Sequence, residues 1–129
     1  MKYHDDGSRP LFGQIFVFGS NLAGIHGAGA AKAARLYYGA QSNVPVGPCN
    51  NSYAIPTKGF NFNCLTLDEI KSRVDQFVEY TKRHSELQFF ITRVGCGLAG
   101  NDDEEIAPMF KDCGDNCSFA EQWKEFLEV

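Results

Sequence analysis

Two glycine-rich stretches of the 129-residue chain have the composition of loops that hold a phosphate group. The first is GSNLAGIHGAGAA, from Gly19 to Ala31, and the second is RVGCGLAGN, from Arg93 to Asn101. Glycine adopts positive φ and leaves backbone N–H groups open to a ligand, and a following helix N-terminus adds partial positive charge. Each stretch alone is as typical of a tight turn with close helix packing as it is of a phosphate-binding loop. Two of them at one edge of a sheet favour a diphosphate ligand.

Side chains within these stretches offer further chemistry. His26 lies in the first, where an imidazole can donate to a phosphate or transfer a proton, although a solvent-exposed side chain without a role is the alternative. Cys96 lies in the second, and no neighbouring histidine is present to activate it, so we expect a small buried packing residue. The P-loop pattern is absent, and Lys32 stands where a dinucleotide-binding fingerprint needs a small residue.

Other candidate groups are aromatic or metal-binding. Tyr37, Tyr38 and Phe60 are candidates for a platform on which a base stacks, with core packing as the alternative for at least one tyrosine. The five cysteines are Cys49, Cys64, Cys96, Cys113 and Cys117, and the three histidines are His4, His26 and His84. Their spacing matches no zinc pattern, so we expect free thiols, no metal site and no cofactor.

Short elements must position these groups. Apolar runs predict strands at 14–20, 52–57 and 87–95, because each is rich in β-branched and aromatic residues and is bounded by turn residues. The alanine-rich segment 27–39 predicts a helix. Residues 41–51 have turn chemistry throughout. The two glycine-rich stretches therefore follow the first and third strands.

A second helix has the clearest signature. Thr66 and Glu69 have the spacing of a capping box, and Leu67, Ile70, Val74, Phe77 and Val78 then recur on one helical face. Acidic residues open a predicted short helix at 102–110. A last strand at 116–120 and an amphipathic helix at 121–127 follow.

Alternating strands and helices without a tight hairpin predict an α/β fold, with a mostly parallel sheet, crossover helices and both faces covered. The length predicts that residues 1–129 form a single domain. The net charge is −4, from 12 Lys and Arg against 16 Asp and Glu, without a basic cluster, so nucleic acid is not expected as a partner. No apolar run reaches the ~20 residues of a membrane span, and the N-terminus has no apolar leader core. These features predict a cytoplasmic protein.

The order of three stretches resembles macro domains, the modules that bind ADP-ribose. They are GSNLAGIHGAGAAKAARLYYGA, NSYAIPTK and ITRVGCGLAGNDDEEIAPMF. The resemblance covers roughly Gln14 to Phe110. It is strongest to the compact branch that includes the terminal ADP-ribose protein glycohydrolase and small macro-like proteins of phages and bacteria. It implies a macro-like three-layer fold and an ADP-ribose-like nucleotide as the small-molecule partner.

The resemblance also implies roles for individual residues. Asn21 matches an asparagine near the distal ribose, and Lys58 matches the lysine that attacks the anomeric carbon in the glycohydrolase. An amine nucleophile needs a lowered pKa or a nearby base, and Arg93 is the cation that the topology offers. The implied ligand-binding residues are Ser20, Asn21, His26, Gly27, Ala28, Gly29, Thr57, Gly95, Cys96, Gly97, Leu98, Ala99 and Gly100.

The chain departs from the family pattern at two places. Ala99 stands where the glycohydrolase has an aspartate after Gly-Cys-Gly-Leu. Asp102 is a candidate substitute, together with Asp103, but both equally suit the N-terminal charge of the next helix. The aspartate that reads adenine in the family is also missing, and Asp5 and Asp6 are the available replacements.

The resulting expectation is a domain that binds ADP-ribose or a related NAD-derived nucleotide between its two glycine-rich loops. Hydrolysis of an ADP-ribosyl or ADP-ribose phosphate bond by Lys58, with Asp102 or His26 in support, is one reading. The other is a non-catalytic nucleotide sensor or sponge, for example a phage protein that sequesters an NAD-derived signal. A nucleophile without its acid–base partner argues for binding alone.

Overall fold

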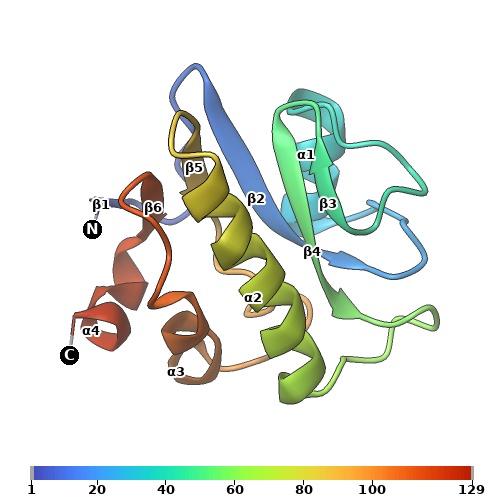
Figure 1. Ribbon diagram of the computed structural model, residues 1–129. Helices are drawn as coiled ribbons and strands as arrows, with labels where there is room; N and C mark the ends of the chain where they lie inside the picture. Colours follow the sequence, from blue (N-terminus) through green and yellow to red (C-terminus); the bar gives the residue numbers. More distant parts are fainter. Residues whose placement is uncertain (1, 129) are drawn as a thin grey trace.

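The computed structural model describes residues 2–128 and contains a six-stranded sheet in the order β1-β6-β5-β2-β4-β3 (Figure 1). All neighbouring strands pair in parallel except β3 and β4, which are antiparallel. The predicted α/β class with a mostly parallel sheet is confirmed. The strands are β1 (Lys2–His4), β2 (Gln14–Asn21), β3 (Gly47–Cys49), β4 (Ser52–Lys58), β5 (Gln88–Ile91) and β6 (Cys117–Ala120).

Helices cover both faces of this sheet unequally. The helices are α1 (Gly29–Tyr37), α2 (Leu67–Arg83), α3 (Asp103–Ile106) and α4 (Lys124–Leu127), with 3₁₀ turns η1 (Ala107–Phe110) and η2 (Glu121–Trp123). In Figure 1, α2 and α3 lie in front of the sheet and α1 lies behind it. The helix α1 packs chiefly on β2.

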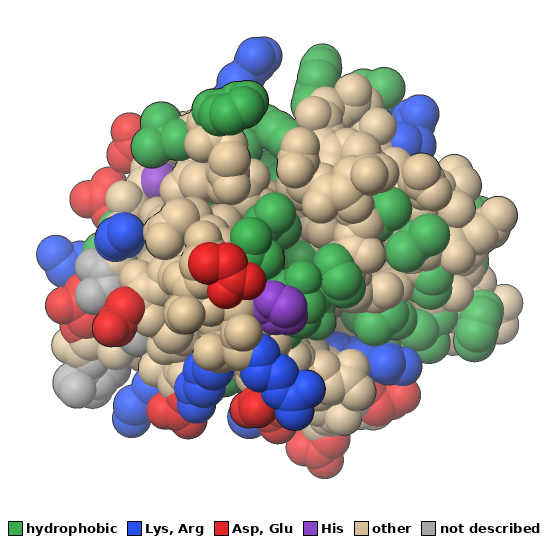
Figure 2. All heavy atoms as spheres, turned by 45° about the horizontal axis from the view of Figure 1, so that its top comes forward, with side chains coloured by type: hydrophobic (Ala, Val, Ile, Leu, Met, Phe, Trp, Pro, Cys, Tyr) green, Lys and Arg blue, Asp and Glu red, His purple; other side chains and the backbone are tan. Residues whose placement is uncertain are grey.

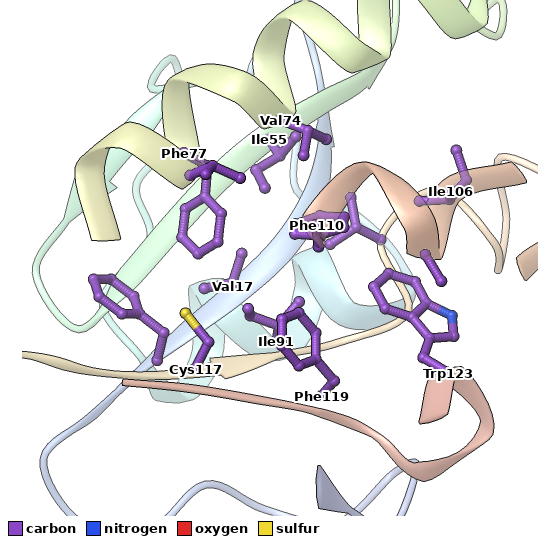
Figure 3. Close-up of a cluster of buried hydrophobic side chains, with 14 of the residues drawn as sticks. Val17, Ile55, Val74, Phe77, Ile91, Ile106, Phe110, Cys117, Phe119 and Trp123 are labelled. Atoms are coloured by element: carbon purple, nitrogen blue, oxygen red, sulfur yellow. The ribbon is translucent and has the colours of Figure 1, made fainter. Parts of the chain in front are cut away.

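The larger core lies between the sheet and α2, α3 and η1 (Figure 3). Val17 of β2 and Ile91 of β5 point toward this side, where they meet Phe77 of α2 and Phe110 of η1. Ring pairs such as Phe77 with Phe110, whose centroids lie 6.0 Å apart, fill the layer. Burial of these rings contributes to the hydrophobic stabilisation of the fold.

The helix α2 forms as its sequence predicts. The Thr66 hydroxyl accepts a hydrogen bond from the backbone N–H of Glu69 at 3.2 Å. The Glu69 carboxylate accepts one from the backbone N–H of Thr66 at 3.1 Å, which completes the capping box. This helix buries Ile70, Val74, Phe77 and Val78 of the expected stripe, together with Thr81. Leu67, the first residue of the helix, was expected in the stripe but is exposed.

A smaller core lies between the sheet and α1. Because side chains alternate along a strand, Phe16 and Phe18 of β2 point toward α1 while Val17 points away. They pack on Ala31 and Ala34 of α1 and on Phe90 of β5. The small side chains of α1 let the helix approach the sheet closely.

Several predicted boundaries are wrong. Residues 47–49, expected as turn, form β3 and join β4 through a tight hairpin in which Asn50 has φ 53°. Such hairpins place Asn in the left-handed region, so the expected absence of a tight hairpin is also wrong. The third strand ends at Ile91, short of Gly95. The edge strand β1, not predicted, lies beside β6.

Surface charge is mixed on the face that Figure 2 presents. Lys and Arg side chains alternate there with Asp and Glu along the lower and left-hand rim. Within residues 2–128, no helix combines the length and the apolar character that crossing a membrane requires.

Candidate functional site

A cleft of about 740 Å³ opens at the carboxyl ends of β2, β4 and β5, on the face that α1 covers. This is the edge at which ligands bind in parallel α/β sheets. Both glycine-rich stretches reach it. Of the residues expected to bind a ligand, Ser20, Asn21, Gly27, Ala28, Gly29, Thr57, Lys58, Gly95, Gly97, Leu98 and Ala99 line it, whereas His26, Cys96, Gly100 and Asp102 do not.

The two stretches touch each other inside the cleft. A Cβ atom placed on Gly29 would lie 3.2 Å from Cδ1 of Leu98, and one placed on Gly19 would lie 3.2 Å from the backbone nitrogen of Gly95. Glycine at positions 19 and 29 therefore allows the loops to meet. Gly29 also has φ 57°, in the left-handed region that glycine adopts without strain.

The first loop presents the N-terminus of α1 to the cleft. The N-cap residue Ala28 supplies no side-chain hydrogen bond to the first helical turn. The N–H groups of that turn therefore lack the side-chain acceptor that Ser, Thr or Asp would supply there. Helix N–H groups of this kind bind anions such as phosphate. The helix begins at Gly29 rather than at Gly27, so Gly27 and Ala28 belong to the loop.

The side chain of Asn21 shapes this loop. Its amide Nδ2 donates to the carbonyl oxygen of Ile25 at 2.7 Å, and its Oδ1 accepts from the backbone N–H of Ile25 at 3.1 Å. Asn21 also lines the cleft. Its first role in this structure is therefore to hold the loop closed over five residues, which sets the position of the glycines that follow.

His26 is buried rather than exposed. Its side chain is 2 % accessible, and its ring meets the ring of Phe18 edge-on, with centroids 5.2 Å apart. Neither ring nitrogen has a hydrogen-bond partner among the described residues. The ring faces the sheet instead of the cleft, so this arrangement does not support the expected donation to a ligand. The carbonyl oxygen of His26 accepts a hydrogen bond from Nε of Arg35 at 3.0 Å.

The second loop is held by its own backbone and by one amide. The carbonyl oxygen of Gly95 accepts hydrogen bonds from the backbone N–H of Asn101 at 3.0 Å and from its Nδ2 at 2.9 Å. Cys96 points away from the cleft, and burial raises the pKa of its thiol to about 12. A thiol with so high a pKa carries almost no thiolate near neutral pH. The expectation of an inert packing residue agrees with this environment.

Lys58 ends β4 and lines the cleft. Its ammonium group has no ion pair within residues 2–128. The neighbouring Thr57 is buried, and its hydroxyl donates to the carbonyl oxygen of Ser20 at 3.4 Å. The Ser20 hydroxyl donates to the carbonyl oxygen of Pro45 at 2.5 Å. These two hydroxyl groups tie β2 to its neighbours, and Lys58 is the charged side chain at this end of β4.

Arg93 is tied to carboxylates. Its Nε and Nη2 donate to both carboxylate oxygens of Asp103, at 2.9 and 2.5 Å, and its Nη1 lies 3.4 Å from Asp6. The guanidinium lowers the pKa of Asp103, and Trp123 donates to the same carboxylate at 2.7 Å. The charge of Arg93 is thus compensated, so it is a poor candidate for activating Lys58. The Asp103 carboxylate is likewise engaged by Arg93 and Trp123. Asp102 stands at the N-cap position of α3 without a side-chain capping hydrogen bond and does not line the cleft.

The opposite end of the cleft is aromatic. His4 stacks on Phe90 with ring centroids 3.7 Å apart, and Phe16 stacks on Tyr38 at 4.5 Å. All four rings line the cleft. Burial lowers the pKa of His4, whose Nδ1 lies 2.7 Å from the Ser118 hydroxyl.

The expected stacking residues are divided by the structure. Tyr37 and Tyr38 line the cleft, and Phe60 does not. Arg9 lies over the ring of Tyr37, with its Cζ 5.9 Å from the centroid. Asp6 also lines the cleft, in contact with Arg93.

Three aromatic residues that line the cleft were not predicted from the sequence: His4, Phe16 and Phe90. The spacing of Phe16 and Phe18, which places both on one face of β2, could have indicated the smaller core beside α1. No pattern indicated that β1 would bring His4 beside them. In the part of the chain that the structure describes, no group of three His, Cys, Asp or Glu side chains is arranged to hold a metal ion.

Comparison with known proteins supports the fold alone. No protein-family model and no curated protein matches the sequence. The fold is similar to a solved structure of a protein of unknown function from Bacteroides thetaiotaomicron, with a TM-score of 0.57 and 18 % sequence identity. The match covers 92 % of this chain and 96 % of that one, so the similarity of fold extends over most of both chains.

Proposed function

We propose that the cleft binds ADP-ribose or a related NAD-derived nucleotide. One observation carries this proposal: two glycine-rich loops meet at the carboxyl edge of a parallel sheet, beside the uncapped N-terminus of α1. Backbone N–H groups at such a place suit a diphosphate. The resemblance of the same loops to those of macro domains supports the choice of ADP-ribose.

The two ends of the cleft suit the two ends of this ligand. The half-buried rings of His4 and Tyr38, which stack on the buried Phe90 and Phe16, offer a surface for adenine. The diphosphate then lies against Gly27 to Gly29 and Gly95 to Leu98. The distal ribose reaches Lys58, whose ammonium is free to donate to its hydroxyl groups.

Binding without turnover is the function that the cleft favours. Ala99 lines the cleft where the glycohydrolase carries its aspartate. Among the described residues, Asp6 is the one carboxylate in the lining, and it contacts Arg93 and Gln122. General acid–base catalysis needs a group within reach of the proton that it moves. A nucleotide sensor or sponge is therefore the first reading, and hydrolysis through Lys58 is the second.

Calorimetry with purified protein tests this proposal. We expect ADP-ribose to bind, and AMP and ribose 5-phosphate to bind at least about tenfold more weakly, because each lacks half of the contacts. If AMP binds as tightly as ADP-ribose, the proposed diphosphate site is wrong and the cleft is an ordinary adenine pocket. Absence of binding by all three compounds would remove the nucleotide assignment.

A further inference from the structure

The loop that follows β4 holds one aromatic side chain in an unusual conformation. Phe62 has φ 62°, in the left-handed region that bulky residues rarely adopt. The loop closes through two backbone hydrogen bonds. The N–H of Gly59 donates to the carbonyl oxygen of Asn63 at 2.8 Å, and the N–H of Phe62 donates to the carbonyl oxygen of Gly59 at 3.1 Å. Lys58 and Cys64 pair at its base as an antiparallel bridge. Backbone strain that the surroundings enforce clusters at ligand sites.

The strained residue lines the cleft. Phe62 is 48 % exposed, so its ring lies in the wall without being buried in a core. Ile25 and Leu98, from the two glycine-rich loops, are also exposed and line the same cleft. Leu98 lies against the start of α1, as its short distance to a Cβ on Gly29 indicates. Three loops thus each contribute one uncovered apolar side chain.

The charge around this wall restricts what it can bind. Lys58 directly precedes the loop of Phe62, lines the cleft and has no ion pair within the described chain. A cationic group on the ligand would be repelled by this ammonium. A neutral, planar ring would cover the exposed apolar surface and stack on Phe62.

We propose that Phe62, with Ile25 and Leu98, binds a neutral planar heteroaromatic ring carried on the distal ribose. The preferred ligands are then dinucleotides such as NADH, whose dihydronicotinamide ring is uncharged, rather than ADP-ribose alone. This inference rests on the proposed function, because it takes the distal ribose to lie at Lys58. It makes Phe62 a residue that determines specificity.

Calorimetric titration with ADP-ribose, NADH and NAD⁺ tests the inference. The wild-type protein is expected to bind NADH about tenfold more tightly than ADP-ribose, the range of one aromatic stacking contact. NAD⁺ is expected to bind more weakly than NADH because its ring is cationic. NADH binding no tighter than ADP-ribose, or NAD⁺ binding tighter than NADH, would overturn the inference while leaving the ADP-ribose site intact.

Four variants test whether Phe62 is responsible for the tighter binding of NADH. Phe62→Ala and Phe62→Asn are expected to lose about tenfold in NADH affinity and to keep ADP-ribose affinity within about twofold. The asparagine variant guards against misfolding, because Asn tolerates positive φ. Phe62→Tyr retains the ring and is expected to keep NADH affinity. Phe60→Ala is the matched control, since Phe60 lies in the same loop, is 71 % exposed and does not line the cleft.

Two results separate this inference from the proposed function. If the wild-type protein binds neither ADP-ribose nor NADH, both the proposed nucleotide site and the ring subsite are ruled out. Equal NADH affinity in the wild type and in a folded Phe62→Asn variant would remove the ring subsite alone.

Discussion

Replacement of Gly27 by valine isolates the contact between ligand and loop backbone. Gly27 lines the cleft, and a Cβ placed on it would meet only Cγ2 of Ile25, at 3.9 Å. Its φ lies outside the left-handed region, so a β-branched residue fits the backbone. We expect the free energy of unfolding to change by less than about 0.5 kcal/mol, the range of ordinary surface substitutions.

The same substitution is expected to remove binding. The valine methyl groups would occupy the space in which the diphosphate approaches the backbone N–H groups. A loss of about 100-fold in ADP-ribose affinity, or roughly 2.7 kcal/mol, is the expected magnitude. Gly29→Ala is the contrast: φ is 57° there, so any side chain costs about 1 to 2 kcal/mol of stability.

Thermal unfolding and calorimetry measure both effects. Ligand at 100 times its Kd adds about 2.7 kcal/mol of stability, which for 129 residues is a rise in Tm of roughly 10 °C. The wild-type protein is expected to show this rise, and Gly27→Val to melt at the wild-type temperature without it. A folded Gly27→Val variant with wild-type affinity would refute the placement of the ligand on this loop.

Three further outcomes are expected. If any ADP-ribosyl hydrolysis occurs, Ala99→Asp should raise its rate by supplying the missing carboxylate and Lys58→Ala should abolish it; release by Lys58→Ala at the wild-type rate would exclude the lysine mechanism. Burial lowers the pKa of His4, so its contribution to stability is complete above pH ~6.5 and declines as the pH falls below that value. Urea unfolding at pH 7.5 and 5.5 should therefore show a smaller pH dependence for His4→Gln than for the wild type, and equal dependences would contradict this. Thr66→Ala should lower the free energy of unfolding by about 1 kcal/mol through loss of the N-cap, and an unchanged urea midpoint would count against it.

The sequence by itself determined the elements that rest on local physics. The helix α2 follows from a capping box and an apolar stripe, both of which depend on residues a few positions apart. The strands β2 and β4 follow from short apolar runs bounded by turn residues. The rule that ligands sit at the carboxyl edge of parallel strands then places Gly27, Lys58 and Leu98 near one another before any coordinates are known.

The edge strands β1 and β3 were not predicted from the sequence because they are short and carry no repeating pattern. The strand β1 comprises Lys2 to His4, and β3 contains Pro48, so neither has an apolar alternation. Each exists because a neighbouring strand offers unpaired backbone groups: β6 for β1 and β4 for β3. The partner of β1 lies more than 100 residues away in the chain, whereas β3 pairs with β4 through a local hairpin.

Tertiary packing alone decided which side chains face the cleft. His26 and Gly27 are adjacent, yet one is buried against Phe18 and the other lines the cleft. His4 reaches Phe90 only because β1 joins the far side of the sheet through β6. Phe62 lines the cleft from a loop that closes through backbone hydrogen bonds and holds this residue at a positive φ. Local sequence sets propensity, whereas these orientations come from contacts between segments far apart in the chain.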